Sequence, residues 1–157
     1  MKKYLFLTLI ILILLNSCNN NYESEAFTNP INCINMMYKN NLAYLDDILY
    51  TGACLVYTSD NKKSRLLSFV EGVPNGKHEG YYYPGEEVEY SGNRKKGEIH
   101  GNYVRYHLNG TIHISGKLKK GFRIGKWKFY DNEGKLFEEK KYFNGKVSDS
   151  TIYLWEK

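Results

Sequence analysis

Residues 97–111 read GEIHGNYVRYHLNGT, and residues 121–135 read GFRIGKWKFYDNEGK. The second stretch begins 121 − 97 = 24 residues after the first, and its glycines and aromatic residues recur at matching places. The matching residues are Gly97, Gly101, Tyr103, Tyr106, Gly110 and Gly116 in the first stretch and Gly121, Gly125, Trp127, Tyr130, Gly134 and Lys140 in the second. Such a period indicates stacked supersecondary units, each of which buries its apolar face only against its neighbours.

Two weaker copies precede this pair. The first has the pattern Gly52-x-Cys54-x-x-Tyr57, and the second is anchored at Gly80-x-Tyr82. The predicted structural anchors of the array are therefore Gly52, Gly80, Gly101, Gly125, Tyr82, Tyr103, Tyr106, Trp127 and Tyr130.

Each copy has the alternation of a half-buried strand. Apolar residues and glycine from Ile112 to Leu118 alternate with polar residues from His113 to Lys119. Dipeptides that accept positive φ angles predict tight hairpin turns at Asn75-Gly76, Asn109-Gly110, Glu133-Gly134 and Asn144-Gly145. Glycines 92, 101, 116 and 125 are expected to leave room for the ring of the next copy. We therefore predict an all-β fold, an elongated single-layer antiparallel sheet of repeated hairpins.

The N-terminal segment has a different character. Lys2 and Lys3 precede the apolar run Tyr4–Leu15, which is shorter than the roughly 20 residues that span a bilayer. The following Leu15-Asn16-Ser17-Cys18 resembles a bacterial lipobox, which implies a cleaved signal peptide and acyl chains on Cys18. The predicted organisation is a lipoprotein signal peptide at 1–18, a flexible tether at 19–33 and the repeat domain at 34–157.

The start of the repeat domain is less regular. Residues 34–49 have an apolar spacing that a helix would accept, but Asp46-Asp47 separates two short apolar runs. We expect a hairpin over 42–50 and one or two helical turns within 33–40.

Two cysteines remain once Cys18 is assigned to lipid. An exported chain permits a disulfide between Cys33 and Cys54. Alternatively, Cys54 is a small buried hydrophobe at the place that Tyr103 and Trp127 occupy in later copies. The sequence leaves both interpretations open.

The repeats resemble MORN repeats, and more closely the bacterial variant of the YwqK-type family that is often labelled as antitoxins. Residues 75–82, 97–103 and 121–135 carry the resemblance, which extends over about 42–147. Asp149 replaces the glycine expected before the last strand, as in an atypical terminal copy. The resemblance implies hairpins laid side by side, and binding or scaffolding in place of catalysis.

Motifs for catalysis, phosphate binding and zinc binding are missing from the sequence, so we expect neither an enzyme nor a cofactor. His107 and His113 flank a predicted turn and would meet across a hairpin. Two histidines without a third ligand are weak evidence for a metal, and no metal site is predicted.

Charge is distributed unevenly. Residues 90–146 carry 14 basic and 5 acidic side chains, 14 − 5 = +9, whereas residues 19–89 carry 5 and 10, 5 − 10 = −5. The candidate binding surface consists of the lysines that alternate with apolar residues, Lys117, Lys119, Lys126, Lys128 and Lys141. Two interpretations stay open, a solvated face that prevents edge pairing and a working surface.

The expected location is the cell envelope, on a bacterial membrane and outside the cytoplasm, with the outer membrane favoured. We expect a non-enzymatic scaffold that binds a protein partner there. Alternatives are an antitoxin or immunity-type protein against an exported toxin, and a basic surface for anionic lipid or polysaccharide. Nucleic acid is not expected, because the basic surface would lie beyond the inner membrane.

Overall fold

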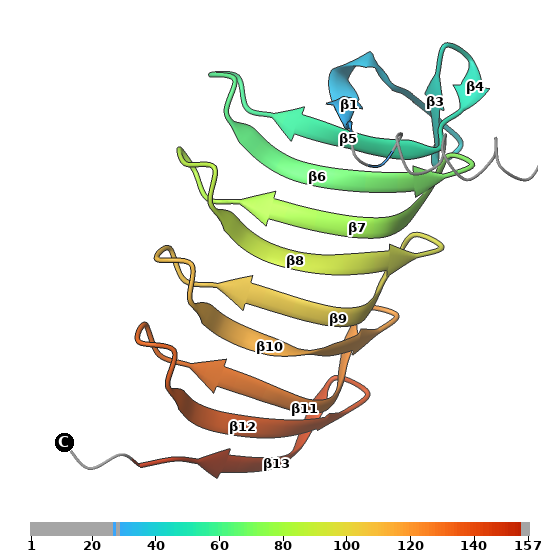
Figure 1. Ribbon diagram of the computed structural model, residues 1–157. Helices are drawn as coiled ribbons and strands as arrows, with labels where there is room; N and C mark the ends of the chain where they lie inside the picture. The colour runs from blue at the N-terminus through green and yellow to red at the C-terminus, as the bar shows by residue number, and fades with distance from the viewer. Residues whose placement is uncertain (1–26, 28, 155–157) are drawn as a thin grey trace, which may run out of the picture.

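The computed structural model describes residue 27 and residues 29–154. The predicted signal peptide, Cys18 and most of the predicted tether lie outside these residues. The chain forms a ten-stranded sheet and a three-stranded sheet (Figure 1). The elements are β1 (Ile31–Asn32), a 3-10 helix η1 (Cys33–Asn35), β2 (Met37–Lys39), β3 (Leu42–Leu45), β4 (Ile48–Leu49), β5 (Gly52–Tyr57), β6 (Lys63–Val70), β7 (Val73–Tyr81), β8 (Val88–Lys95), β9 (Glu98–Tyr106), β10 (Ile112–Lys119), β11 (Phe122–Tyr130), β12 (Leu136–Phe143) and β13 (Lys146–Ile152). Within this part of the chain, no helix has the length and hydropathy of a membrane span.

The large sheet is an open array of successive hairpins. Its strands lie in the order β1-β5-β6-β7-β8-β9-β10-β11-β12-β13, so that from β5 onward each strand pairs with the next in sequence. All of these pairs are antiparallel except β1 with β5, which is parallel. The predicted all-β array of hairpins is confirmed. Ile31 and Asn32, placed in the tether by the sequence, pair with Cys54 and Leu55.

At its N-terminal end the sheet has a second layer. The hairpin expected over 42–50 is present as β3 and β4, and β2 completes a small sheet beside it. Met36 and Ala43 from this segment pack with Cys54 and Phe69 in the hydrophobic core. The single layer predicted for the whole domain therefore holds only beyond this end. Of the helical turns expected within 33–40, only η1 forms, and β2 follows it directly.

The hairpins are closed by two kinds of turn on opposite rims of the sheet (Figure 1). The tight-turn rim carries the dipeptides Glu71-Gly72, Lys96-Gly97, Lys120-Gly121 and Asn144-Gly145, in which both residues have positive φ. The long-turn rim carries longer loops, in which Gly110 and Gly134 close turns by donating to the carbonyls of His107 and Asp131. The turn predicted at Asn75-Gly76 is wrong, because Glu71-Gly72 makes it and Gly76 lies inside β7.

Each tight turn is also bonded to the preceding hairpin. The second residue of every such turn is a glycine whose N–H donates to a carbonyl of the copy before it. The bonds run from Gly72 to Tyr50 at 2.8 Å, from Gly97 to Pro74 at 2.7 Å, from Gly121 to Ile99 at 2.8 Å and from Gly145 to Arg123 at 3.0 Å. These bonds fix neighbouring hairpins in the same relative position along the array.

The strand register corrects the anchors of the second copy. A single cross-strand row runs Cys54, Leu67, His78, Gly92, Tyr103 and Gly116. His78, and not Tyr82, therefore occupies the place of Tyr103, as Cys54 does in the first copy. The glycine two residues before it is Gly76, which replaces Gly80 as the equivalent of Gly101. The shared pattern is Gly-x-ring-x-x-Tyr, with Cys54 in place of the ring in the first copy.

The glycines of this pattern have two separate roles. At Gly116 an added Cβ would overlap the Trp127 ring, and at Gly92 it would lie 3.2 Å from the Tyr103 ring, as the sequence predicted. Gly101 and Gly125 do not make room for rings, because nothing lies within 4 Å of an added Cβ. They have φ angles of 86° and 65°, which L-residues rarely adopt.

Candidate functional site

One face of the large sheet, which we call the ladder face, carries a row of rings that contact one another. The ring centroids are 5.1 Å apart between His78 and Tyr90, 6.1 Å between Tyr90 and Tyr103, and 6.0 Å between Tyr103 and Trp127. Tyr142 continues the row by an edge contact with Trp127 at 6.1 Å. Trp127 is only 1% exposed. The predicted ring anchor Trp127 is thus internal to the domain, and Tyr103, which is partly buried, packs between Tyr90 and Trp127.

An arginine completes the burial of Trp127. The Arg123 guanidinium lies 4.3 Å from the centroid of the Trp127 ring and donates to the Tyr142 hydroxyl at 3.0 Å. The indole N–H of Trp127 donates to the Lys117 carbonyl at 3.2 Å. Because its polar atom is bonded and its faces are covered, Trp127 is not available to an external partner.

His78, at the other end of the ladder, is buried and uncharged at neutral pH. Burial, together with the positive charges of Arg94 and Arg65, lowers its pKa from 6.5 to about 4, whereas Glu79 opposes the shift. Its Nε2 lies 3.5 Å from the Tyr90 hydroxyl. His78 is therefore neutral near pH 7, and its ring packs against that of Tyr90.

The five predicted lysines lie on the opposite face, which we call the lysine face. Ser115 pairs with Lys128, Lys117 with Ile124, and Lys126 with Lys141. Since paired residues point to the same side and alternate residues share a face, Lys119 joins this set. All five are exposed: Lys117, Lys119, Lys126, Lys128 and Lys141.

Three of these lysines surround a shallow depression of about 610 Å³ over β9, β10 and β11. Val104, Ile124 and Tyr130 give it an apolar part, and Asn102 and Ser115 add neutral polar groups. Its cationic members are Lys117, Lys126 and Lys128. An apolar part bordered by cations suits an extended partner that carries both apolar and anionic groups.

Acidic side chains reduce the charge at the C-terminal side of this face. Glu139 pairs with Lys126 at 2.9 Å and raises the pKa of that ammonium. Asp149 lies opposite Lys141 in the register of β12 and β13. Among the described residues no ion pair involves Lys117 or Lys128. The positive potential over the depression therefore comes mainly from these two ammonium groups.

A second charged feature, the difference between the two rims, was not predicted from the sequence. The tight-turn rim and its flanking residues carry Lys95, Lys96, Lys119, Lys120 and Lys146 against Glu71 and Glu98, whereas the long-turn rim carries Asp60, Glu86, Glu87, Asp131 and Glu133 against Lys62, Lys63 and Lys135. Phe122 and Phe143, 60% and 73% exposed, lie at the tight-turn rim. The signal was available in the turns, once Lys96-Gly97 and Lys120-Gly121 are identified as turns.

His107 and His113 meet across their hairpin as expected. Their rings stack with centroids 4.3 Å apart, and His107 Nε2 lies 3.0 Å from the Tyr130 carbonyl oxygen. Burial, His107 and Arg105 lower the pKa of His113. No cluster of three or more His, Cys, Asp or Glu within residues 29–154 has metal-binding geometry.

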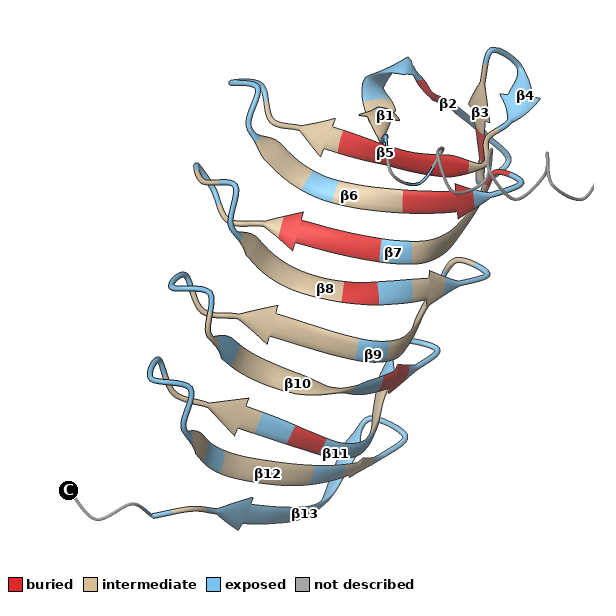
Figure 2. Ribbon diagram, viewed as in Figure 1, coloured by how far each residue is buried: buried red, intermediate tan, exposed pale blue. Residues whose placement is uncertain are grey.

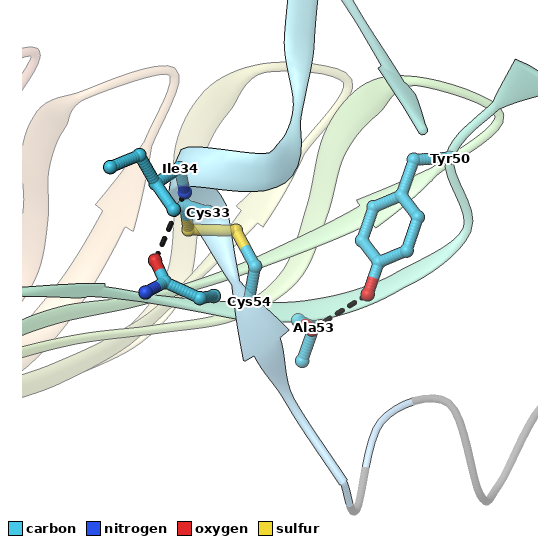
Figure 3. Close-up of a disulfide and its surroundings, with 6 residues drawn as sticks. Cys33, Ile34, Tyr50, Ala53 and Cys54 are labelled. Carbon is cyan, nitrogen blue, oxygen red and sulfur yellow. Dashed lines mark hydrogen bonds between the residues drawn. A yellow bond between two sulfur atoms is a disulfide. The ribbon is translucent and has the colours of Figure 1, made fainter. Parts of the chain in front are cut away.

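Cys33 and Cys54, which the sequence left open, are joined by a disulfide (Figure 3). Cys54 is completely buried, so it is both a bonded cysteine and a core residue. Beside it the Tyr50 hydroxyl donates to the Ala53 carbonyl at 2.7 Å (Figure 3). The bond ties η1 to the first strand of the array.

The tyrosines outside the ladder connect neighbouring copies along the long-turn rim. The Tyr82 hydroxyl donates to the Tyr106 carbonyl at 2.7 Å, and the Asn109 amide donates to the Asn132 carbonyl at 2.8 Å. These contacts and the ladder give Tyr82, Tyr103 and Trp127 structural roles, whereas Tyr130 also lines the depression on the lysine face. The lysine face and the rims are the candidate surfaces. Comparison with protein-family models, with curated proteins and with solved structures finds no match to this chain.

Proposed function

We propose that this chain is a non-enzymatic, membrane-anchored lipoprotein whose hairpin array binds a protein partner in the cell envelope through its lysine face. The observation that carries the proposal is the convergence of Lys117, Lys126 and Lys128 on one depression that also contains apolar side chains. Cations around an apolar patch are typical of a surface that binds by charge and contact area together.

A rigid support makes such a surface specific. The lysines lie on interior strands whose other face is fixed by stacked rings, so their backbone positions do not need ordering when a partner binds. The acyl anchor proposed at Cys18 would keep this surface close to a membrane, and the Cys33–Cys54 disulfide suits an oxidising compartment.

The test is capture of a partner from envelope extract by the full-length chain. We expect Lys117→Glu/Lys128→Glu to abolish capture and the matched double reversal Lys39→Glu/Lys62→Glu, at exposed sites off this face, to leave it unchanged. Equal capture by both double variants would contradict a role for the lysine face. Mass spectrometry of the membrane-bound form tests the anchor, because cleavage before Cys18 and acylation of its thiol are both expected.

The tight-turn rim favours a second candidate function, contact with anionic lipid. Five lysines flank its turns, and the exposed rings of Phe122 and Phe143 would enter the headgroup region. Each lysine near an anionic leaflet contributes about 1 kcal/mol. Vesicles containing phosphatidylglycerol should then bind the unacylated Cys18→Ala chain in a salt-dependent manner, and adding Phe122→Ser/Phe143→Ser to it should weaken binding more than adding the control Leu108→Ser. Binding to neutral vesicles of equal strength would exclude this function.

A further inference from the structure

The first two tight turns, between β6 and β7 and between β8 and β9, are neighbours on the tight-turn rim (Figure 1). A groove of about 540 Å³ with a mostly apolar wall lies between them. The β6–β7 turn contributes Val70, Glu71 and Val73 to it, and the β8–β9 turn contributes Lys95 and Lys96. Apart from Glu71, one side of this groove is therefore apolar and the other is cationic.

Hydrogen bonds between the two copies hold the turns on either side of the groove at a fixed separation. The Gly97 N–H donates to the Pro74 carbonyl at 2.7 Å, and the Lys96 N–H donates to the Asn75 side-chain oxygen at 3.4 Å. Successive tight turns lie two strand spacings apart, roughly 10 Å, which leaves the width of one extended chain between their side chains. The groove is therefore formed before any ligand binds.

The apolar side is particular to this groove. Each tight turn is flanked by one cross-strand pair, and in the first hairpin this pair is Val70 with Val73. The corresponding pairs of the other three hairpins each contain a lysine: Lys95–Glu98, Lys119–Phe122 and Phe143–Lys146. Among the four tight turns of the described chain, two apolar side chains face a neighbouring pair of lysines only here. Val70 is 38% exposed, so burial in the core does not account for an apolar residue at this position.

The cationic side has charge to offer a ligand. Among the residues that the structure describes, no ion pair involves Lys95 or Lys96. Their aliphatic stems extend the apolar wall, while the ammonium groups stay at its border. Glu71 adds one carboxylate, so the lining has a net formal charge of 2 − 1 = +1. A ligand with an anionic group at one end and an apolar body matches both sides.

We propose that this groove binds a soluble anionic amphiphile of the fatty-acid class, with its alkyl chain along Val70 and Val73 and its carboxylate between Lys95 and Lys96. The volume lies within the range of small-molecule sites. The alkyl chain supplies affinity by leaving water, and the two ammonium groups select a negative head over a neutral one. The groove is separate from the lysine face and from the exposed phenylalanines, so the proposal depends neither on a protein partner nor on contact with a bilayer.

The experiment is a titration of the isotope-labelled, unacylated Cys18→Ala full-length chain, followed by two-dimensional NMR of its backbone amides. The probes are laurate, acetate as the head alone, and dodecyl maltoside as the chain with a neutral head, both amphiphiles below their micellar concentrations. We expect laurate to shift the signals of residues 70–73 and 95–97 saturably and to leave those of 119–122 unchanged. The other two probes should need at least about tenfold higher concentrations. Because each amide is observed separately, laurate bound elsewhere is distinguished from laurate in the groove.

Two double variants separate the contributions of the two sides. Val70→Thr/Val73→Thr keeps the shape of the side chains and adds hydroxyl groups, and Lys95→Gln/Lys96→Gln removes both charges. Each should weaken laurate binding at least about fivefold. The amide spectrum of each variant also shows whether it is folded. If a groove variant is not folded, the three probes on the parent chain decide.

The matched control is Lys119→Gln/Lys120→Gln, the same change at the next tight turn, which should leave the affinity for laurate within about twofold. Groove signals that laurate leaves unshifted would overturn the proposal. Equal shifts by acetate or by dodecyl maltoside would also overturn it, as would equal weakening by the control. Vesicle binding without a laurate shift in the groove would leave membrane contact standing and exclude only this site.

Discussion

The hairpins at the two ends of the ten-stranded sheet have the same architecture, but they are stabilised in different ways. At the N-terminal end, the β5–β6 hairpin is covered by a second small sheet and a disulfide, and its buried side chains include Cys54 and Phe69. At the C-terminal end, the β11–β12 hairpin has no second sheet, and the Trp127 ring under Arg123 takes that place. Figure 2 shows the result, since buried residues are concentrated in β5–β7 and β13 is exposed throughout.

This difference shows how a sheet one layer thick acquires an interior. A glycine on one strand exposes the backbone, and a ring from the next strand lies flat on it, as Trp127 does on Gly116. The ring is then buried by its neighbours in the row and not by another layer. Because each hairpin contacts mainly the adjacent ones, stability is a sum of local terms, and the two ends should respond separately to mutation.

The largest expected effect is from Trp127→Ala. Removing a fully buried ring without a second layer to collapse inward should lower the free energy of unfolding by about 3–5 kcal/mol. Hydrogen exchange should show loss of protection in β9–β12 and retention in β5–β6. Trp127→Phe, which keeps a ring on Gly116, is the control. Equal loss of protection at both ends would contradict the independence of the two regions.

Removal of the disulfide is the matching perturbation of the other end. The bond joins residues 21 apart in sequence, and Cys33→Ser/Cys54→Ser should cost about 3 kcal/mol by the loop-entropy estimate. Here β1 and β2–β4 should lose protection first. Reductant should shift the unfolding midpoint of the wild-type chain and leave that of the double variant unchanged; a shift in both would point to another cause.

His78 lies in β7, between the two hairpins compared above, and its protonation makes the free energy of unfolding depend on pH. The unfolded chain binds a proton below the ordinary pKa of 6.5, but the folded chain resists protonation down to about 4. Stability from this group is therefore constant above pH 6.5 and falls as the pH decreases from 6.5 to 4, by at most about 3 kcal/mol. His78→Tyr introduces the residue type found at the equivalent position, Tyr103. The urea unfolding midpoint of this variant should vary less with pH across this range. If the urea midpoint of the variant depends on pH as steeply as that of the wild-type chain, His78 is not the source of the pH dependence.

The smallest effect is expected at Arg123. Its contact with the Trp127 ring and its hydrogen bond to Tyr142 together predict a loss of about 1–2 kcal/mol for Arg123→Ala. Lys120→Ala, at an exposed turn nearby, should be nearly neutral. If Arg123→Ala is equally neutral, the guanidinium does not act as the cover of the ring, and the rings alone stabilise this end.

Much of the fold followed from sequence because the third and fourth copies repeat faithfully. The Gly-x-ring-x-x-Tyr spacing and the alternation around Ile114 fixed strands and faces, and with them the side of the sheet on which Lys117 and Lys128 lie. The second copy was misaligned because Gly80-Tyr82 mimics the pattern of Gly101-Tyr103, whereas the true ring is a histidine. Side-chain type alone does not reveal that His78 is neutral and buried.

The tight turns were the other source of error. Asn-Gly is the strongest hairpin signal, and it located the turn at Asn144-Gly145. Lys96 and Lys120 precede glycines in the same kind of turn without being favoured there, since only their place in the array forces a φ of 52° on each. The basic rim was not predicted for this reason. The N-terminal second layer depends on contacts between residues distant in sequence, which periodicity does not report.

The hydrogen bond from each tight-turn glycine to the preceding copy gives the array an adjustable length. The N–H groups of Gly97, Gly121 and Gly145 each donate to the hairpin immediately before them. A complete repeat could therefore be duplicated or deleted without disturbing bonds elsewhere, whereas an insertion of a few residues between one such glycine and its acceptor would disrupt that bond. Genetic change in such a chain is expected to proceed in whole repeats, so that the length of the sheet varies in fixed steps.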